Sequence, residues 1–291
     1  MEKTKKISLI LATLVVIVLI VIVSLGIFKN CTMEVKNPVA TMEVEGYGTI
    51  KIELYPSQAP ETVTNFIKLA NNGFYNGLTF HRTVPNFMIQ GGDKNGNGTG
   101  TPTFKDLLGE DAEEKDYSIK GEFLANDVKN TVKHKKGTIS MARADYTSLG
   151  LPEEGYNSAG SQFFIVTDDK TGFLDGQYAA FGQVIEGYDV VEKIANVEVV
   201  TRDQNAQEGV DKPVNPPVIS KISVETYGID YGTPKTLTPF NYQNYLRQMY
   251  GISGDGSTSI NTGTEDENTQ QEENNDTTTQ TSENEAEQTN E

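Results

Sequence analysis

The chain has 291 residues, and 41 acidic residues against 24 basic ones give it a formal net charge of −17. This length accommodates one or two domains, and the acidic balance argues against a nucleic-acid partner, because phosphate backbones are bound by basic surfaces. The only cysteine, Cys31, excludes an intramolecular disulfide, and two histidines beside it make no convincing zinc site. We therefore expect no metal and no cofactor.

The N-terminal region begins with residues 1–6, which include Lys3, Lys5 and Lys6, and continues with residues 7–28, which carry no charge. As a helix, residues 7–28 would span about 33 Å, close to the roughly 30 Å of a bilayer core. The positive-inside tendency then predicts a single-pass transmembrane anchor in the cell membrane, with the later chain on the extracytoplasmic side. Two alternatives are a cleaved signal peptide and a lipid anchor at Cys31. A signal peptide normally has a shorter apolar region, and the residues before Cys31 are a poor match to a lipid-anchor site.

After a linker over residues 29–37, residues 38–228 are expected to form the folded domain. Residues 39–45 and 49–55 predict a hairpin around a Gly-Tyr-Gly turn, and residues 57–73 predict a helix that begins near Pro60. The later predicted elements are strands over residues 137–143, 162–167, 179–185 and 218–227, and a short helix over residues 188–196. Many short strands with about two helices favour a mainly β fold, a closed antiparallel barrel with helices at its ends.

Residues 79–93, TFHRTVPNFMIQGGD, predict a strand, a kink at Pro85 and a second extended piece that ends at a glycine pair. Such an arrangement aims one guanidinium and several apolar side chains at a common hollow, which suits an apolar ring attached to an amide. The alternative is structural: Arg82 would form an ion pair, and Phe87 and Met88 would be core residues. On composition alone this alternative is favoured.

Three other site types find little support in the sequence. The run from Asp93 to Gly98 begins like a calcium loop, but its twelfth position is Phe104 rather than a bidentate glutamate. The same run lacks the ending of a phosphate loop. Ser140 and Ser161 sit in no nucleophile elbow, which argues against a serine hydrolase.

The C-terminal part divides into two segments. Residues 251–291 carry eleven acidic residues and no Lys or Arg, so we expect a disordered hydrophilic tail. Residues 229–250 are rich in aromatic side chains, and either a short helix packed on the domain or an ordered start of the tail would account for them. The long polar stretches over residues 94–136 and 144–159 are expected to be loops beside the site.

Five blocks of the sequence resemble, in order and spacing, the cyclophilin family of peptidyl-prolyl cis-trans isomerases. They are NFIKLANNGFYNGLTFHRTVPNFMIQGGD at residues 65–93, NGTGTP at 97–102, GTISMARA at 137–144, SAGSQFFIV at 158–166 and FLDGQYAAFGQVIEG at 173–187. The resemblance covers roughly residues 39–227. It implies an eight-stranded antiparallel barrel closed by two helices, with the site on the outer face of the barrel.

The resemblance also implies roles for individual residues. Arg82 matches the catalytic arginine, and we expect Gln90 to orient it. The residues that match substrate-binding positions are His81, Phe87, Met88, Gly98, Ala142, Arg143, Gln162, Phe164, Phe173, Leu174 and Tyr178. Three of these depart from many family members, because Phe173 replaces tryptophan, Tyr178 replaces histidine and Arg143 replaces asparagine. The first departure leaves cyclosporin binding open.

We therefore expect a peptidyl-prolyl cis-trans isomerase that acts on proline-containing polypeptides and assists the folding of extracytoplasmic proteins. One alternative is a cyclophilin-like module that binds proline-containing segments without catalysis. Another is a structural surface protein in which the acidic tail carries the function.

Overall fold

The computed structural model describes residues 11, 13–23, 36–206 and 209–251. Contacts divide the chain into two compact units, Met1–Phe240 and Asn241–Glu291, and the second contains the helix α6 (Tyr242–Met249). The predicted linker over residues 29–37 lies almost wholly outside the described residues, as does the predicted acidic tail after Gly251. The predicted domain boundaries stay predictions.

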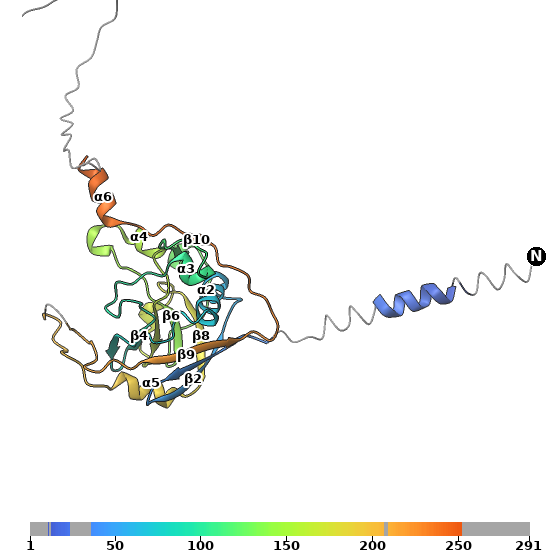
Figure 1. The fold of residues 1–291 in the computed structure, drawn as a ribbon, viewed down its shortest axis with the longest axis horizontal. Helices are drawn as coiled ribbons and strands as arrows, with labels where there is room; N and C mark the ends of the chain where they lie inside the picture. Colours follow the sequence, from blue (N-terminus) through green and yellow to red (C-terminus); the bar gives the residue numbers. More distant parts are fainter. Residues whose placement is uncertain (1–10, 12, 24–35, 207–208, 252–291) are drawn as a thin grey trace, which may run out of the picture. The chain divides into compact units, whose positions relative to one another are not determined.

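The first unit is built mainly from short strands (Figure 1). Its strands are β1 (Val39–Val44), β2 (Gly48–Leu54), β3 (Arg82–Val84), β4 (Met88–Gly91), β5 (Ser118–Ile119), β6 (Thr138–Met141), β7 (Phe163–Val166), β8 (Ala180–Glu186), β9 (Ile219–Glu225) and β10 (Thr236–Leu237). Its α-helices after residue 36 are α2 (Pro60–Asn71), α3 (Phe104–Leu108), α4 (Pro152–Tyr156) and α5 (Tyr188–Ala195), and single 3-10 turns are η1 (Leu124–Asn126), η2 (Thr147–Leu149) and η3 (Gly172–Leu174).

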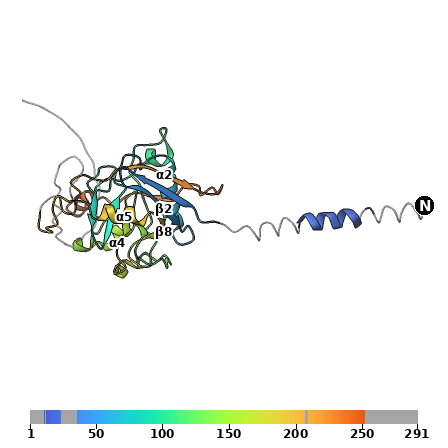
Figure 2. The same ribbon diagram turned by 90° about the horizontal axis from the view of Figure 1, so that it is seen from below.

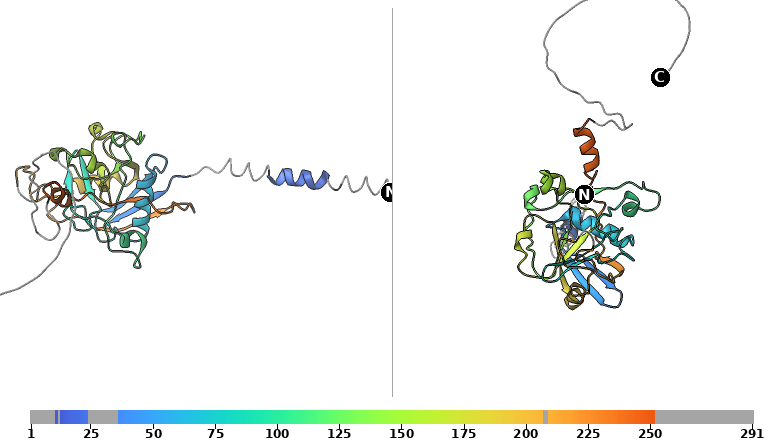
Figure 3. Two further views of the ribbon diagram at one scale, coloured as in Figure 1. Left: turned by 90° about the horizontal axis from the view of Figure 1, so that it is seen from above. Right: turned by 90° about the vertical axis from the view of Figure 1, so that its left-hand side faces the viewer.

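Eight strands form one sheet in the order β3-β4-β7-β6-β8-β2-β1-β9, and every ladder in it is antiparallel. The sequence-predicted hairpin is confirmed as β1 and β2, which pair from Val39 opposite Glu53 to Val44 opposite Gly48. Alternate residues of both strands point into the core, as expected for a sheet with one buried face. Figure 3 shows this hairpin, in blue, alongside β9.

The core is packed between the sheet and its helices. Phe66 of α2 contacts the rings of Tyr75, Phe163 and Phe181 at centroid distances of 5.3–5.9 Å. Helix α2 packs on β9 and α5 packs on β2. Figure 1 shows the strands between these two helices, and Figure 2 shows α5 and β2 from below. Aromatic packing of this kind contributes about 0.5–1.5 kcal/mol per pair beyond the area it buries.

The prediction of a closed barrel was wrong. Within the described residues β3 and β9 are the two edges of the sheet and share no ladder, so the sheet curls into an open half-barrel. The segments that lead into β3 and β9 share the isolated bridge Thr79 to Val218 and three backbone hydrogen bonds over residues 77–80 and 217–219. The prolines at 213, 216 and 217 precede Val218. Because proline has no N–H to donate, the chain that leads into β9 cannot continue a ladder along β3.

The prediction of a transmembrane helix over residues 7–28 was also wrong. No described helix is both long enough and apolar enough to cross a membrane. The described helical residues there are 11 and 13–23. Residues 7–10, 12 and 24–28 lie outside the described residues.

Candidate functional site

Strands β4 and β7 present different side chains to the two faces of the sheet. Ile89 and Ile165 belong to the main core, whereas Met88 and Phe164 belong to a second apolar cluster. This separation follows from the two-residue period of a strand. The second cluster therefore lies on the outer face, opposite the core, as the resemblance implied.

We call this second cluster the outer pocket. Its buried members are Met88, Phe164, Val166 and Leu174, and the partly buried residues packed against them are Val84, Phe87, Ala142 and Tyr178. The ring of Phe87 stacks on that of Phe173 at 5.9 Å, and Phe173 is 68% exposed. Tyr178 meets Phe164 edge to face at 5.6 Å. The pocket thus offers aromatic and aliphatic walls, one of which is open to solvent.

Arg82 lies beside the outer pocket because of the strand register. Arg82 pairs with Gln90 across β3 and β4, and Gln90 pairs with Phe164 across β4 and β7. Directly paired residues point to the same face of a sheet, and neighbouring strands are about 4.8 Å apart. A permanently charged guanidinium, 41% exposed, therefore stands next to the apolar walls, and its ion-pair partner is the carboxylate of Asp211 at 3.7 Å.

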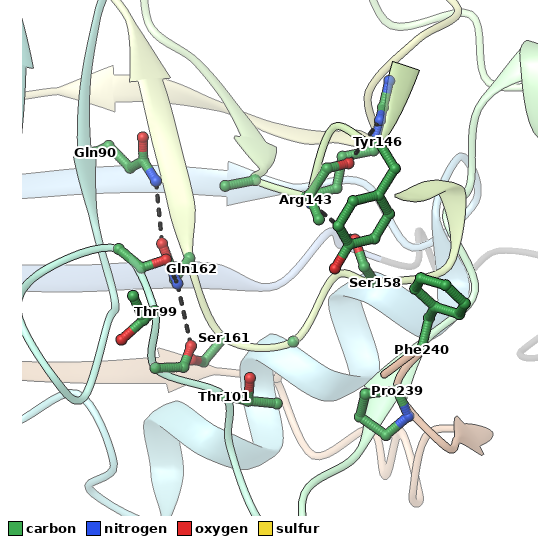
Figure 4. Close-up of a pocket in the computed structure, with 15 residues that line it drawn as sticks. Gln90, Thr99, Thr101, Arg143, Tyr146, Ser158, Ser161, Gln162, Pro239 and Phe240 are labelled. Carbon is green, nitrogen blue, oxygen red and sulfur yellow. Dashed lines mark hydrogen bonds between the residues drawn. The ribbon is translucent and has the colours of Figure 1, made fainter. Parts of the chain in front are cut away.

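The side chain of Gln90 is engaged with Gln162 (Figure 4). Gln90 Nε2 donates to Gln162 Oε1 at 3.1 Å, and Gln162 Nε2 donates to the carbonyls of Gly98 and Gly100, both at 3.1 Å. This chain of amides ties β4 and β7 to the loop over residues 93–100, which we call the glycine loop. The predicted role of Gln90 in orienting Arg82 stays a prediction.

The glycine loop is shaped by the carboxylate of Asp93. Asp93 accepts hydrogen bonds from the backbone N–H groups of Asn97 at 2.7 Å and of Gly98 and Gly100 at 2.6 Å each. A Cβ on Gly100 would lie 2.0 Å from Asp93 Oδ1, so glycine is required there. The carboxylate at the start of the calcium-like run is thus satisfied by the chain itself, and the described residues contain no cluster able to hold a metal ion.

Arg143 fixes the loop that follows β6. We call the hollow between this loop and the glycine loop the groove. The guanidinium carbon of Arg143 lies 4.7 Å from the ring centroid of Tyr178, 5.3 Å from that of Tyr156 and 5.6 Å from that of Phe123. Nε donates to the carbonyl of Gln177 at 3.0 Å, and Nη1 donates to that of Ala144 at 2.9 Å. The guanidinium of Arg143 therefore lies in an aromatic cage and braces the backbone of its own loop.

His81 precedes Arg82 but differs from it in environment. The side chain is buried, and neither ring nitrogen has a hydrogen-bond partner among the described residues. Burial lowers the pKa of His81, and the opposing influence of Asp93 does not offset it. His81 is therefore neutral at physiological pH and adds no charge to the site.

Ser140, His134 and Asp175 are arranged like a catalytic triad. His134 Nδ1 lies 3.0 Å from Asp175 Oδ1, and His134 Nε2 lies 3.1 Å from Ser140 Oγ. However, the side chains of Ser140 and His134 are buried, and the imidazole stacks on Phe164 at 6.1 Å. A substrate carbonyl has no path to the hydroxyl, so this trio supports the outer pocket from beneath.

Two hollows flank the outer pocket. One, of about 310 Å³, runs from Gln90 and Gln162 past Ala142 and Arg143 to Tyr146, Pro239 and Phe240 (Figure 4). The rings of Tyr146 and Phe240 meet at 5.3 Å, so the segment after β10 forms part of the wall. The other, of about 980 Å³, is lined by Arg82, the glycine loop and residues between 200 and 216.

The site thus combines predicted and unforeseen residues. The predicted Arg82, Phe87, Met88, Phe164 and Leu174 gather in one place. Pro239, Phe240 and Asp211 were missed by sequence reasoning. The aromatic content of residues 229–250 signalled an ordered segment but not its position, and nothing in the sequence around Asp211 pointed to Arg82.

Comparisons with known proteins agree with this geometry. The family profile described as cyclophilin type peptidyl-prolyl cis-trans isomerase matches residues 39–224. Peptidyl-prolyl cis-trans isomerase B of Bacillus subtilis is 40% identical over 157 residues, which cover 54% of this chain and 90% of the relative. A peptidyl-prolyl cis-trans isomerase of Synechococcus elongatus is 38% identical over 170 residues, covering 56% of this chain and 96% of that protein.

Other relatives are longer than the region that they share with this chain. Peptidyl-prolyl cis-trans isomerase 9 of Schizosaccharomyces pombe is 38% identical over 178 residues, which are 61% of this chain but 24% of the relative. Among solved structures, a cyclophilin type peptidyl-prolyl cis-trans isomerase of Cryptosporidium parvum has a TM-score of 0.50 and 26% identity, covering 65% of this chain and 98% of that one. With the profile matching most of the chain and the arginine and outer pocket in place, the protein belongs to the cyclophilin-type peptidyl-prolyl cis-trans isomerases, a family of isomerase enzymes.

Proposed function

We propose that this chain accelerates rotation about X–Pro peptide bonds in polypeptides that bind at the outer pocket. The observation that carries the proposal is the strand row Arg82, Gln90 and Phe164, which sets one guanidinium beside an apolar pocket. A proline ring fits the apolar walls, and the adjoining amide then faces the charged donor.

The uncatalysed reaction is slow because of resonance in the amide. Its barrier is about 18–20 kcal/mol, and an X–Pro bond isomerises in tens to hundreds of seconds. No covalent bond is made or broken, so neither a nucleophile nor a redox group is required. In the twisted transition state the proline nitrogen regains its lone pair and becomes a hydrogen-bond acceptor.

Arg82 can bind that nitrogen better when the amide is twisted than when it is planar. Because a guanidinium stays protonated, it donates the hydrogen bond without transferring its proton, and this difference in binding lowers the barrier. One such bond contributes about 1.5–3 kcal/mol, whereas a millionfold acceleration needs about 8 kcal/mol. The outer pocket and the groove must supply the remaining reduction of the barrier. They do so by holding the proline ring while the other side of the amide rotates.

The test is cis/trans exchange of an Ala-Pro peptide, followed by NMR in the absence of protease. We expect the full chain to accelerate exchange and Arg82→Ala to lower kcat/KM at least about tenfold, or about 1.4 kcal/mol. Arg247→Ala, which changes an exposed arginine of α6, is the matched control and should stay within about twofold.

Two other outcomes would change the conclusion. Equal rates for Arg82→Ala and the parent would remove Arg82 from the mechanism. A folded parent that binds the peptide without accelerating its exchange would instead support a non-catalytic proline-binding module.

We further propose that the enzyme works on the extracytoplasmic side and assists the folding of exported proteins. The support lies in the sequence, where three lysines precede the uncharged residues 7–28, an order that is typical of exported chains. Protease added to intact cells should then digest the protein. Protection that is lost only after lysis would place the protein inside the cell and contradict this proposal.

A further inference from the structure

The segment between α5 and β9 folds back on itself and covers the free edge of β3. Its two arms are joined by hydrogen bonds from Val200 N to the carbonyl of Lys212 at 2.8 Å and from Val214 N to that of Glu198 at 2.9 Å. From this segment, the carbonyl of Asp211 accepts the backbone N–H of Thr83 at 2.9 Å. Asp211 is therefore fixed next to Arg82, the residue that precedes Thr83 on β3.

The backbone at Asp211 is suited to an aspartate and holds it in one place. Its φ is +57°, a left-handed conformation that aspartate and asparagine adopt more readily than most other residues. Asp211 N donates to the carbonyl of Thr201 at 2.8 Å. Both backbone groups are thus engaged, which fixes the backbone of Asp211 beside β3.

The carboxylate of Asp211 is buried between two arginines. Its side chain is 2% exposed, Oδ1 lies 3.0 Å from Nη1 of Arg202, and Oδ2 lies 3.7 Å from Nη2 of Arg82. The same Nη1 of Arg202 also donates to the carbonyl of Thr83. Gln204 Nε2 also donates to Oδ2 at 3.4 Å. A buried carboxylate is costly unless it is paired, and the two guanidiniums supply the opposite charge that this one requires.

The 3.7 Å separation makes Arg82 and Asp211 an ion pair rather than a direct hydrogen bond. A guanidinium carries five N–H donors, so a carboxylate behind it restricts its position and still leaves donors for the groove. Arg202 engages the other carboxylate oxygen and thereby keeps Asp211 from swinging towards Arg82 and covering those donors.

We propose that Asp211, held by Arg202, is a positioning residue that fixes the guanidinium of Arg82 for X–Pro isomerisation. This inference rests on the proposed catalytic role of Arg82. It assigns to the segment before β9 a part in the reaction, in addition to closing the edge of the sheet. The competing explanation is purely structural, with Asp211 only anchoring its segment to β3.

A double-mutant cycle on the full chain separates the two explanations. Asp211→Asn keeps the shape of the side chain and tolerates the positive φ, while it removes the charge. We expect Asp211→Asn to lower kcat/KM for the Ala-Pro peptide about fivefold through kcat, with KM within about twofold. In an Arg82→Ala background the same substitution should change kcat/KM by less than about twofold, because residues that act through one another are not additive.

Controls keep the result interpretable. Asp203→Asn changes an exposed carboxylate of the same segment, whose Oδ1 accepts hydrogen bonds from the backbone and side chain of Asn205, and should leave kcat/KM unchanged. Arg202→Gln is a second variant that loosens Asp211 without altering it, and it should reproduce the loss in kcat. In both variants that loosen the pair, the NMR order parameter of the Arg82 Nε–Hε group should fall.

The outcomes divide clearly. A fall in kcat that disappears in the Arg82→Ala background supports the positioning role. A fall in kcat for Asp211→Asn that persists in the Arg82→Ala background overturns it. An unchanged kcat in Asp211→Asn, or in Arg202→Gln, also overturns it. If Arg82→Ala alone leaves the parent rate unchanged, the proposed function of Arg82 fails instead, and this result is distinct from a failure of Asp211 alone.

Discussion

Arg143 shows how a single residue can shape the wall of a candidate site. It stands where many members of the family that the sequence resembles have asparagine, and its guanidinium lies against three aromatic rings. Such contacts contribute about 0.5–1 kcal/mol each where water can reach them. Because Arg143 also donates to the carbonyl of Ala144, the cage and the groove backbone are mechanically linked.

We therefore predict that Arg143→Ala destabilises the fold by about 1–2 kcal/mol and raises the KM for the peptide more than it lowers kcat. Arg143→Lys should recover little of either loss, since an ammonium cannot stack its plane on a ring or donate in two fixed directions. Urea unfolding and peptide kinetics on both variants check this. Full rescue by lysine would show that charge alone, rather than the planar cage, is what the loop requires.

At the scale of elements, local patterns were good predictors where the stabilising contacts are local. The hairpin of β1 and β2 follows from alternation and a glycine turn, and the helix expected over residues 57–73 is α2, Pro60–Asn71. The start of α2 was not predictable in detail. Its N-cap residue, Ala59, makes no side-chain cap.

The N-terminus of α2 is capped instead by a residue far along the chain. Glu122 accepts the backbone N–H of Glu61 at 3.0 Å and that of Thr62 at 2.8 Å, which satisfies donors that a helix leaves unpaired at its start. Burial raises the pKa of Glu122, although these hydrogen bonds oppose the rise. No sequence pattern links Glu122 to α2, because the pairing exists only once the fold has formed.

The same distinction explains the candidate site. Arg82, Met88 and Phe164 could be predicted because motifs place them on adjoining strands. Asp211 and Phe240 could not, since each reaches the groove from a loop whose path depends on long-range contacts. The open seam was missed for a related reason, because edge pairing between β3 and β9 depends on where prolines 213, 216 and 217 fall relative to the opposite strand.

For the molecule as a whole, the two histidines couple folding to pH. His81 and His134 are the only histidines in the chain, and burial is the largest cause of a lowered pKa in each. Near pH 7.5 both are neutral in the folded and unfolded states. Below about pH 6.5, the ordinary histidine pKa, the unfolded chain takes up protons before the folded one does, so the free energy of unfolding falls as the pH falls.

We predict a loss of up to about 1.4 kcal/mol per pH unit for each histidine, between pH 6.5 and the lowered pKa of the folded protein. Glu122, with its raised pKa, acts in the opposite direction, so the histidine contribution is taken at pH 7.5, 6.5 and 5.5 from the difference between the parent and a histidine variant that keeps Glu122. Urea unfolding of the parent and of His134→Gln provides the check. The variant is expected to be less stable throughout but to lose less stability on acidification, because it has one fewer group to protonate. Parallel curves for the two proteins would mean that His134 titrates alike in both states, and would place the pH sensitivity elsewhere.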